Sequence, residues 1–211
     1  MIIAVDGPAA SGKGTVARRL AAHLKLAYLD TGALYRAVAL SVLRAGADPS
    51  DPNTAAGHAY ALDPALTEDP DIRTAASGAA ASKVAAVPAV RAELLDFQRH
   101  FAEHPPEGSK GAVLDGRDIG TVVCPHADRK LFIIADVEIR AERRFKELLG
   151  RGEAAIYARV LEDLRERDAR DGSRADAPMR QAEDAMLLDT THLDPDQAFK
   201  AALAYVESGT I

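Results

Sequence analysis

A glycine-rich loop that carries one lysine is the first feature of the chain able to do chemistry. Residues 7–15 read Gly-Pro-Ala-Ala-Ser-Gly-Lys-Gly-Thr, between an apolar strand-like run at 2–6 and a stretch of helical spacing at 16–24. Glycines let backbone N–H groups surround an anion, and the N-terminus of the next helix adds partial positive charge. Lys13 supplies a full charge for the β- and γ-phosphates of a nucleotide. The pattern predicts a phosphate-binding loop, the structural alternative being a glycine-rich turn without a ligand.

Position 14 departs from the general form of such loops. Many of them carry Ser or Thr directly after the lysine, where the hydroxyl holds Mg²⁺, whereas this chain has Gly14 and then Thr15. The case for direct metal ligation by Thr15 is therefore weaker. Nucleotide oxygens and waters would supply more of the coordination, as Mg²⁺ prefers. A loop ending in Lys-Gly-Thr resembles those of the nucleoside monophosphate kinases.

A second group of charged residues, Asp115-Gly116-Arg117-Asp118, follows a strand-like run at 112–114. Asp115 is placed to act on Mg²⁺ through water, as acidic residues at the end of a neighbouring strand often do. Arg117 can reach a second phosphate, and Asp118 can accept hydrogen bonds from a base. The alternative is a turn with local ion pairs.

An arginine-rich segment at 165–174 holds four charged residues three or four positions apart, which would share one face of a helix: Arg167, Arg170, Asp171 and Arg174. Guanidinium groups match phosphate oxygens, so this face could bridge phosphates. A solvated helix with salt bridges is the alternative. Beside a phosphate loop we favour a mobile flap, because arginines stabilise the charge that spreads over oxygens in phosphoryl transfer.

A third group lies at 30–36, where Asp30 or Thr31 can cap the helix that follows. Arg36 comes one turn into that helix, on a face that could point to a cleft.

The elements that must position these residues alternate between strand and helix. Strand-like runs lie at 2–6, 25–29, 112–114, 130–135 and 186–189, with helices predicted at 16–24, 33–43, 138–149 and 195–206. This alternation predicts a parallel sheet covered on both faces, with ligands beyond the carboxyl ends of the strands. Residues 47–70 are rich in proline and read as loop, whereas 72–101 reads as an alanine-rich helical region with a second helix from Pro88.

Composition narrows the class of protein. The chain has 211 residues, a net charge of −6, one cysteine (Cys124) and six scattered histidines. We expect one main core, no internal disulfide, no broad nucleic-acid surface, no membrane span and a cytoplasmic location without a leader. Cys124 is expected to be a small buried apolar residue.

Several blocks together closely resemble bacterial cytidylate kinases and run in order along nearly the whole chain. The most specific are Asp-Gly-Arg-Asp-Ile-Gly-Thr-Val-Val at 115–123 and Arg-Asp-Ala-Arg-Asp at 167–171. Others are the phosphate loop and the blocks at 30–36, 72–74, 80–85 and 87–91. The resemblance implies an α/β fold of the P-loop NTPase type, adenylate-kinase-like, with a five-stranded parallel sheet flanked by helices. It also implies a monophosphate-binding insert and a short lid.

The resemblance also implies Mg-ATP-dependent phosphorylation of CMP and dCMP by a monomer. Residues matching the family's ATP-phosphate loop are Gly7, Pro8, Ala9, Ala10, Ser11, Gly12, Lys13, Gly14 and Thr15. Residues matching its contacts with the acceptor nucleotide are Thr31, Arg36, Ser82, Arg91, Arg117, Asp118, Arg167, Asp171 and Arg174. The groups expected to stabilise the transferring phosphoryl group are Lys13, Arg117, Arg167, Arg170 and Arg174, with Thr15 and Asp115 toward the metal.

We predict a core of residues 1–36, 106–149 and 176–211, an insert at 37–105 and a lid at 150–175. Residues 62–71 are too short and too rich in proline for the small three-stranded sheet that better-known members carry there. Alternatives are a UMP or AMP kinase, a shikimate- or gluconate-type kinase, which usually has Ser or Thr after the loop lysine, and an ATP-binding regulator without turnover.

Overall fold

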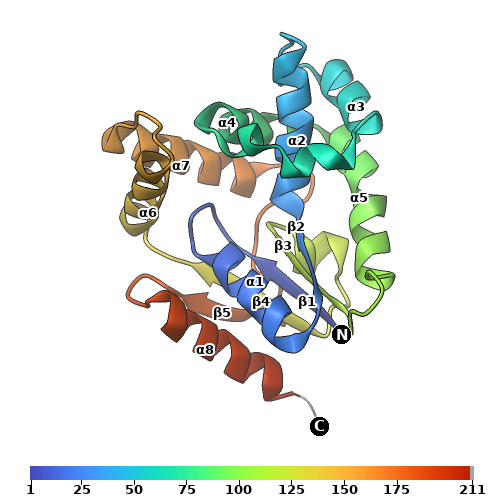
Figure 1. Ribbon diagram of the computed structural model, residues 1–211, viewed down its shortest axis with the longest axis vertical. Coiled ribbons are helices and arrows are strands. Elements are labelled where there is room, and N and C mark those ends of the chain that lie inside the picture. Colours follow the sequence, from blue (N-terminus) through green and yellow to red (C-terminus); the bar gives the residue numbers. More distant parts are fainter. Residues whose placement is uncertain (210–211) are drawn as a thin grey trace.

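Short apolar runs rich in Ile, Val and Leu form one parallel sheet, as Figure 1 shows. The computed structural model describes residues 1–209, so the last two positions of the predicted core lie outside the described residues. The strand order is β2-β3-β1-β4-β5. The strands span Ile2–Asp6 (β1), Ala27–Asp30 (β2), Ala112–Gly116 (β3), Arg129–Ile134 (β4) and Met186–Asp189 (β5). The predicted α/β fold with five parallel strands is confirmed.

Helices cover both faces of the sheet because its central strands are buried on both sides. On one face, α1 (Lys13–Leu24) and α8 (Pro195–Glu207) pack over the strands. Their buried side chains form one apolar cluster with the strands, among them Leu20, Val113, Leu131 and Val206. On the other face, α5 (Pro88–Glu103) and a turn at Ile119–Val123 cover β1 and β3.

A second group of helices lies beyond the carboxyl ends of the strands, in the upper part of Figure 1. There α2 (Thr31–Arg44), α3 (Pro52–Tyr60) and α4 (Ala75–Val84) share an apolar cluster with α5. A further pair, α6 (Val137–Gly150) and α7 (Tyr157–Ser173), packs through Leu148, Val160 and Leu164. Because α4 contacts α7, the two helical groups meet opposite the sheet.

The prediction that residues 47–70 are loop was wrong for the stretch that forms α3. The Asp51 side chain accepts a hydrogen bond of 2.7 Å from the Thr54 N–H, and Pro52 occupies the first turn. Proline is well tolerated there because the N–H that it lacks would have no partner in the helix. Residues 62–73 form only two short 3₁₀ turns, Pro64–Glu68 and Pro70–Arg73, each capped by an aspartate, so no sheet is present in that stretch.

The predicted domain boundaries at 36 and 149 fall inside the continuous helices α2 and α6. The division into core, insert and lid therefore stays a prediction. Cys124 is buried, and burial raises the pKa of its thiol to about 11, as expected for an apolar filler. Among the helices of residues 1–209, none is both long enough and apolar enough to cross a membrane.

Candidate active site

A cavity of about 260 Å³ lies between the carboxyl ends of the strands and the helices that face them. Residues from the phosphate loop, β2, β3, α2, α4, α6 and α7 line it. Ten basic side chains and five carboxylates are in the lining, which gives a net formal charge of +5 in a chain whose overall charge is −6. The basic members are Lys13, Arg18, Arg36, Arg73, Arg91, Arg117, Arg144, Arg151, Arg167 and Arg174.

The loop at 7–15 connects β1 to α1 and leaves its backbone donors free. Within the described residues, no N–H from Ala9 to Gly14 donates to a protein acceptor. Positive φ angles at Ala10 (59°) and Gly12 (87°) curl the backbone there. At Gly7 a Cβ would lie 2.0 Å from the Ile133 carbonyl oxygen, so only glycine fits against β4. Successive backbone N–H groups without protein acceptors in such a turn can form a nest for an anion.

Lys13 reaches the cavity from the first turn of α1. Its Nζ lies 3.4 Å from the Pro8 carbonyl oxygen and 3.7 Å from Asp115 Oδ1. Burial, together with the charge of Arg117, lowers the pKa of Lys13 to about 8. A bound polyanion would therefore stabilise the charged form of Lys13.

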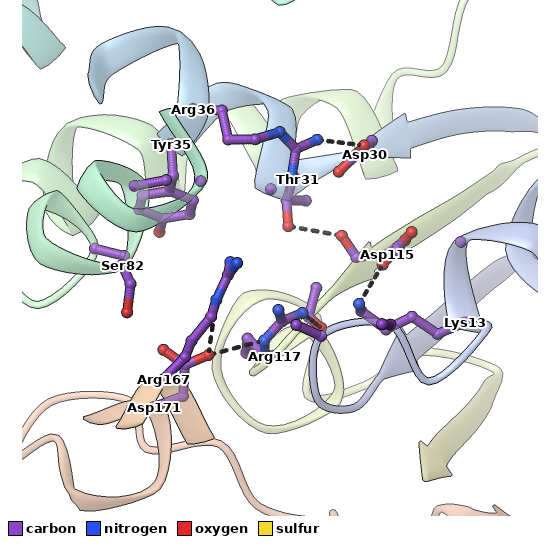
Figure 2. A pocket seen from close by; sticks show the side chains of 18 of the residues that line it. Lys13, Asp30, Thr31, Tyr35, Arg36, Ser82, Asp115, Arg117, Arg167 and Asp171 are labelled. Atoms are coloured by element: carbon purple, nitrogen blue, oxygen red, sulfur yellow. Dashed lines mark hydrogen bonds and ion pairs between the residues drawn. The ribbon is translucent and has the colours of Figure 1, made fainter. Parts of the chain in front are cut away.

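Asp115, at the end of β3, stands beside Lys13 and is almost fully buried. Tyr28 donates a 3.0 Å hydrogen bond to Asp115 Oδ2, and Thr31 Oγ1 donates one of 2.7 Å to the Asp115 backbone carbonyl. Burial raises the pKa of Asp115. Figure 2 shows Asp115 with Lys13 on one side of the cavity and Thr31 close by.

Asp30 caps α2 through the Ala33 N–H (3.0 Å) and holds Arg36 Nη2 at 2.7 Å. Although burial opposes the charge of Asp30, Arg36 and Lys13 lower its pKa. The predicted position of Arg36, one turn into the helix and facing the cavity, is observed (Figure 2).

Three residues of α7 and the β3 exit form a charged group in the middle of the cavity. Asp171 Oδ2 accepts a 3.0 Å hydrogen bond from Arg117 Nε and lies 3.9 Å from Arg167 Nε. Burial raises the pKa of Asp171, but the charges of Arg117 and Arg167 lower it by more. The pKa of Asp171 is therefore below its ordinary value. Burial and the nearby Arg117 lower the pKa of Arg167 to about 10. One carboxylate is therefore shared by two guanidinium groups, which leaves positive charge in excess.

The far end of the cavity, formed by α4 and α5, holds the other predicted contacts. Arg91 and Asp118 are both buried and form an ion pair through Nη2 and Oδ2. Burial raises the pKa of Asp118 although Arg91 opposes it. Ser82 lines the same end, and its Oγ accepts a 3.2 Å hydrogen bond from Arg170 Nε.

Four nitrogen atoms of the cavity guanidinium groups are buried without a hydrogen-bond partner in the described residues: Arg36 Nε, Arg167 Nε, Arg174 Nε and Arg174 Nη2. An unpaired buried donor costs roughly 1–3 kcal/mol. These unpaired N–H donors come from three segments of the chain, and acceptor oxygens of a bound ligand could satisfy them.

Most residues predicted from the sequence line this cavity. Five positions of the phosphate loop do not: Gly7, Pro8, Ser11, Gly12 and Thr15. Arg170 does not line it either, because its guanidinium turns to Ser82 and Glu166. The prediction that Arg174 lies on the helix was wrong: α7 ends at Ser173, and Arg174 reaches the cavity from the connection beyond.

Sequence reasoning missed several basic residues of the lining. Arg144 and Arg151 contact the backbone carbonyl of Arg73 at 3.5 and 2.8 Å, and both pair with Glu147. Their positions, with Glu147 between them, follow the i, i+3, i+7 spacing of one helix face, which could have indicated a shared role. Arg73 lies in the block at 72–74 that resembles the family, but the resemblance gave it no role at the site.

Comparison with known proteins gives a consistent result. A family model described as cytidylate kinase matches residues 3–208. Cytidylate kinases from Rhodospirillum rubrum and Paramagnetospirillum magneticum are each 60% identical, over 96% and 98% of this chain and 95% and 98% of their own length. One from Methylocella silvestris is 59% identical over 99% of this chain and 94% of its own.

Two solved structures share the fold. An uncharacterized protein from Eubacterium ventriosum has a TM-score of 0.58 at 17% identity, with 99% of each chain covered. A sugar kinase from Janibacter has a TM-score of 0.51 at 14% identity, over 99% of this chain and 95% of that one. From the family model and the close relatives, the chain belongs to the cytidylate kinase family.

Proposed function

We propose that the cavity transfers the γ-phosphoryl group of Mg-ATP to CMP and dCMP. A phosphotransferase that uses ATP and acts on CMP follows from membership of the cytidylate kinase family. The observation that carries the site assignment is the set of buried guanidinium nitrogens without partners, opposite a loop of free backbone N–H groups. Two anions brought end to end would satisfy both sets of donors.

The donor end is assigned to the loop from Gly7 to Thr15. Its free N–H groups would hold the ATP phosphates, and Lys13 would follow the γ-phosphoryl group as it transfers. Mg²⁺ fits here as an ion carried by the nucleotide. Asp115 is a buried carboxylate beside Lys13, whereas no cluster of three or more acidic, His or Cys ligands exists in residues 1–209. Asp115 would hold the ion through water, with Thr15 as a further candidate. The ion supplies charge neutralisation.

The acceptor end is assigned to residues from three segments. Arg36, Arg117 and Arg174 would bind the CMP phosphate, because each brings a guanidinium group to the cavity. We assign Arg167 and Asp171 to the sugar. Thr31 is a further candidate contact with the acceptor nucleotide, because it lines the cavity, and its hydroxyl donates to the Asp115 carbonyl.

The cytosine ring is assigned to Ser82, Arg91 and Asp118. Cytosine offers an amino donor at N4 and acceptors at N3 and O2, which suit a carboxylate and a guanidinium respectively. Uracil presents an acceptor and an N–H at the corresponding positions, so both contacts would be wrong. Mismatches of buried polar groups can give discrimination on the order of 10⁴.

Transfer needs no strong general base, because the acceptor phosphate is already ionised at neutral pH. Catalysis then consists of positioning and charge neutralisation. Arg117 and Arg167 would stabilise the transferring group, with Arg174 and Arg170. Arg170 would first have to leave Ser82. We further propose that residues 37–105 act as the CMP-binding insert and residues 150–175 as the lid, whose closure excludes water, and that the enzyme is a monomer.

The experiment that tests the function measures ADP release from Mg-ATP with CMP, dCMP, UMP and AMP as acceptors. We expect kcat/KM for CMP and dCMP to exceed that for UMP and AMP by orders of magnitude. A preference for UMP or AMP would replace the proposed acceptor, and ATP binding without product from any of the four would contradict an enzyme. A single species of about 22 kDa in light scattering is expected for the monomer.

A further inference from the structure

A polar contact between the phosphate loop and the end of β5 is not used by the mechanism above. Thr190 follows β5 and is 2% exposed, and its Oγ1 donates a 2.8 Å hydrogen bond to the Ser11 carbonyl oxygen. The same hydroxyl lies 3.1 Å from the Ile134 carbonyl oxygen. The contact joins segments 179 positions apart in the chain.

Arg143, on α6, fixes the direction of the Thr190 hydroxyl. Its Nη1 donates to Thr190 Oγ1 at 3.1 Å, and its Nη2 donates to the Thr190 carbonyl oxygen at 2.7 Å. A threonine hydroxyl has one proton and two acceptor lone pairs. Because Arg143 donates to a lone pair of Thr190 Oγ1, the hydroxyl proton of Thr190 is free to bond a carbonyl oxygen. The Ser11 carbonyl, at 2.8 Å, is closer to it than the Ile134 carbonyl, at 3.1 Å.

The Ser11 carbonyl determines where the next backbone donor points. In a trans peptide unit the C=O and the following N–H lie in one plane and point in opposite directions. With the Ser11 carbonyl directed at Thr190, the Gly12 N–H points away from Thr190. That N–H belongs to the group without protein acceptors. Gly12 has φ of 87°, and because glycine adopts positive and negative φ about equally, its own backbone preference does not fix this peptide unit.

We propose that Thr190, oriented by Arg143, is a positioning residue that locks the Ser11–Gly12 peptide so that its N–H faces the ATP phosphates. This inference rests on the proposed function, since it takes the loop to be the ATP-phosphate site. Its effect should fall on the ATP side, because Thr190 contacts the phosphate loop at Ser11, whereas neither Thr190 nor Arg143 lines the cavity that holds Arg91 and Asp118.

The test compares Thr190→Val, which keeps the shape and removes the hydroxyl, with Thr190→Ser, which keeps the hydroxyl. Kd values are measured by titration with Mg-ATP alone and with CMP alone, beside kcat and both KM values. We expect Thr190→Val to raise Kd and KM for ATP about tenfold, with CMP binding within twofold of wild type, since a buried carbonyl loses its donor. Thr190→Ser should stay within twofold for both.

A matched control is Ser208→Ala, which removes a hydroxyl that donates to the Tyr205 carbonyl at 2.8 Å at the end of α8, outside the proposed insert and lid. It should leave both Kd values unchanged. Equal losses of affinity for ATP and CMP in Thr190→Val would overturn the inference in favour of a general structural role. So would a Thr190→Ser variant that fails to restore the affinity for ATP. Wild-type turnover of CMP, measured first, separates this outcome from failure of the proposed function.

The role of Arg143 is tested by a double-mutant cycle with Arg143→Met. If Arg143 acts through Thr190, the double variant should bind ATP no more weakly than the weaker of the two single variants. Fully additive losses would overturn that part of the inference, because they would show a separate contribution of Arg143.

Discussion

Gly14 occupies the position where many phosphate loops carry a hydroxyl residue, yet we expect a hydroxyl here to reduce activity. Gly14 is the second residue of α1, and a Cβ added to it would lie 2.9 Å from Asp115 Oδ2 and 3.6 Å from Arg18 Nη2. Asp115 cannot easily withdraw, because its Oδ2 is held by Tyr28 at 3.0 Å and the side chain is buried. A side chain at 14 would therefore push Asp115 away from its place beside Lys13.

The magnitude follows from two opposing terms. Overpacking a tight site costs about 1–3 kcal/mol. Alanine in place of a helical glycine gains up to about 1 kcal/mol in helix propensity, so the free energy of unfolding of Gly14→Ala should stay within about 2 kcal/mol of wild type. Helix propensity does not compensate for the loss of transition-state stabilisation when Asp115 is displaced. With about 1.4 kcal/mol for each factor of ten, kcat/KM should fall roughly ten- to a hundredfold.

The assay is ADP release with Mg-ATP and CMP, together with urea denaturation, for Gly14→Ala and Gly14→Ser. Gly57→Ala is the matched control, because Gly57 is a helical glycine in α3 with nothing within 4 Å of an added Cβ. It should gain stability and keep wild-type kinetics. If Gly14→Ser matched or exceeded wild-type kcat/KM, the steric reasoning about Asp115 would be refuted.

Four further outcomes are expected. Lys13→Ala and Arg117→Ala should each retain less than about a tenth of the turnover, with unchanged circular dichroism. Each removes a positive charge proposed to stabilise the transferring group, and an arginine in that role contributes roughly 10³–10⁵ in rate; higher activity would contradict their roles. Since burial lowers the pKa of Lys13 to about 8, below its ordinary value, the charged form is lost earlier as pH rises. The kcat/KM profile should therefore decline above about pH 8, and Lys13→Arg should lack that decline. Asp118→Asn should narrow the preference for CMP over UMP at least tenfold in the acceptor assay, and an unchanged ratio would remove Asp118 from base recognition. EDTA should abolish turnover and added Mg²⁺ should restore it; full activity without a divalent ion would count against the proposed metal.

Features set by neighbouring residues were predictable from the sequence. The phosphate loop carries its glycines, its lysine and the start of α1 in one run, and β3 leads directly into the segment that holds Arg117. The cap of α2 by Asp30 is equally local. Strand–helix alternation then placed these pieces at one edge of a parallel sheet.

Features that depend on distant contacts were not predictable. The turn of Arg170 toward Ser82 joins residues 88 positions apart, and it takes this arginine out of the cavity. The position of Arg73 depends on Arg144 and Arg151, which donate to its carbonyl from 71 and 78 positions away in the chain. For α3, proline was read as a loop signal, whereas after an aspartate cap it starts a helix.

If Arg91 and Asp118 recognise the base as proposed, their ion pair means that each group competes with the nucleobase for the other. A base that enters exchanges one set of buried hydrogen bonds for another, so its net gain is a small difference between two large quantities. A cognate ring satisfies both groups again, whereas a ring with inverted donors and acceptors leaves them worse off than in the empty pocket. Under that assignment, selectivity would come at the expense of affinity, and the product would leave readily once the phosphoryl group has moved.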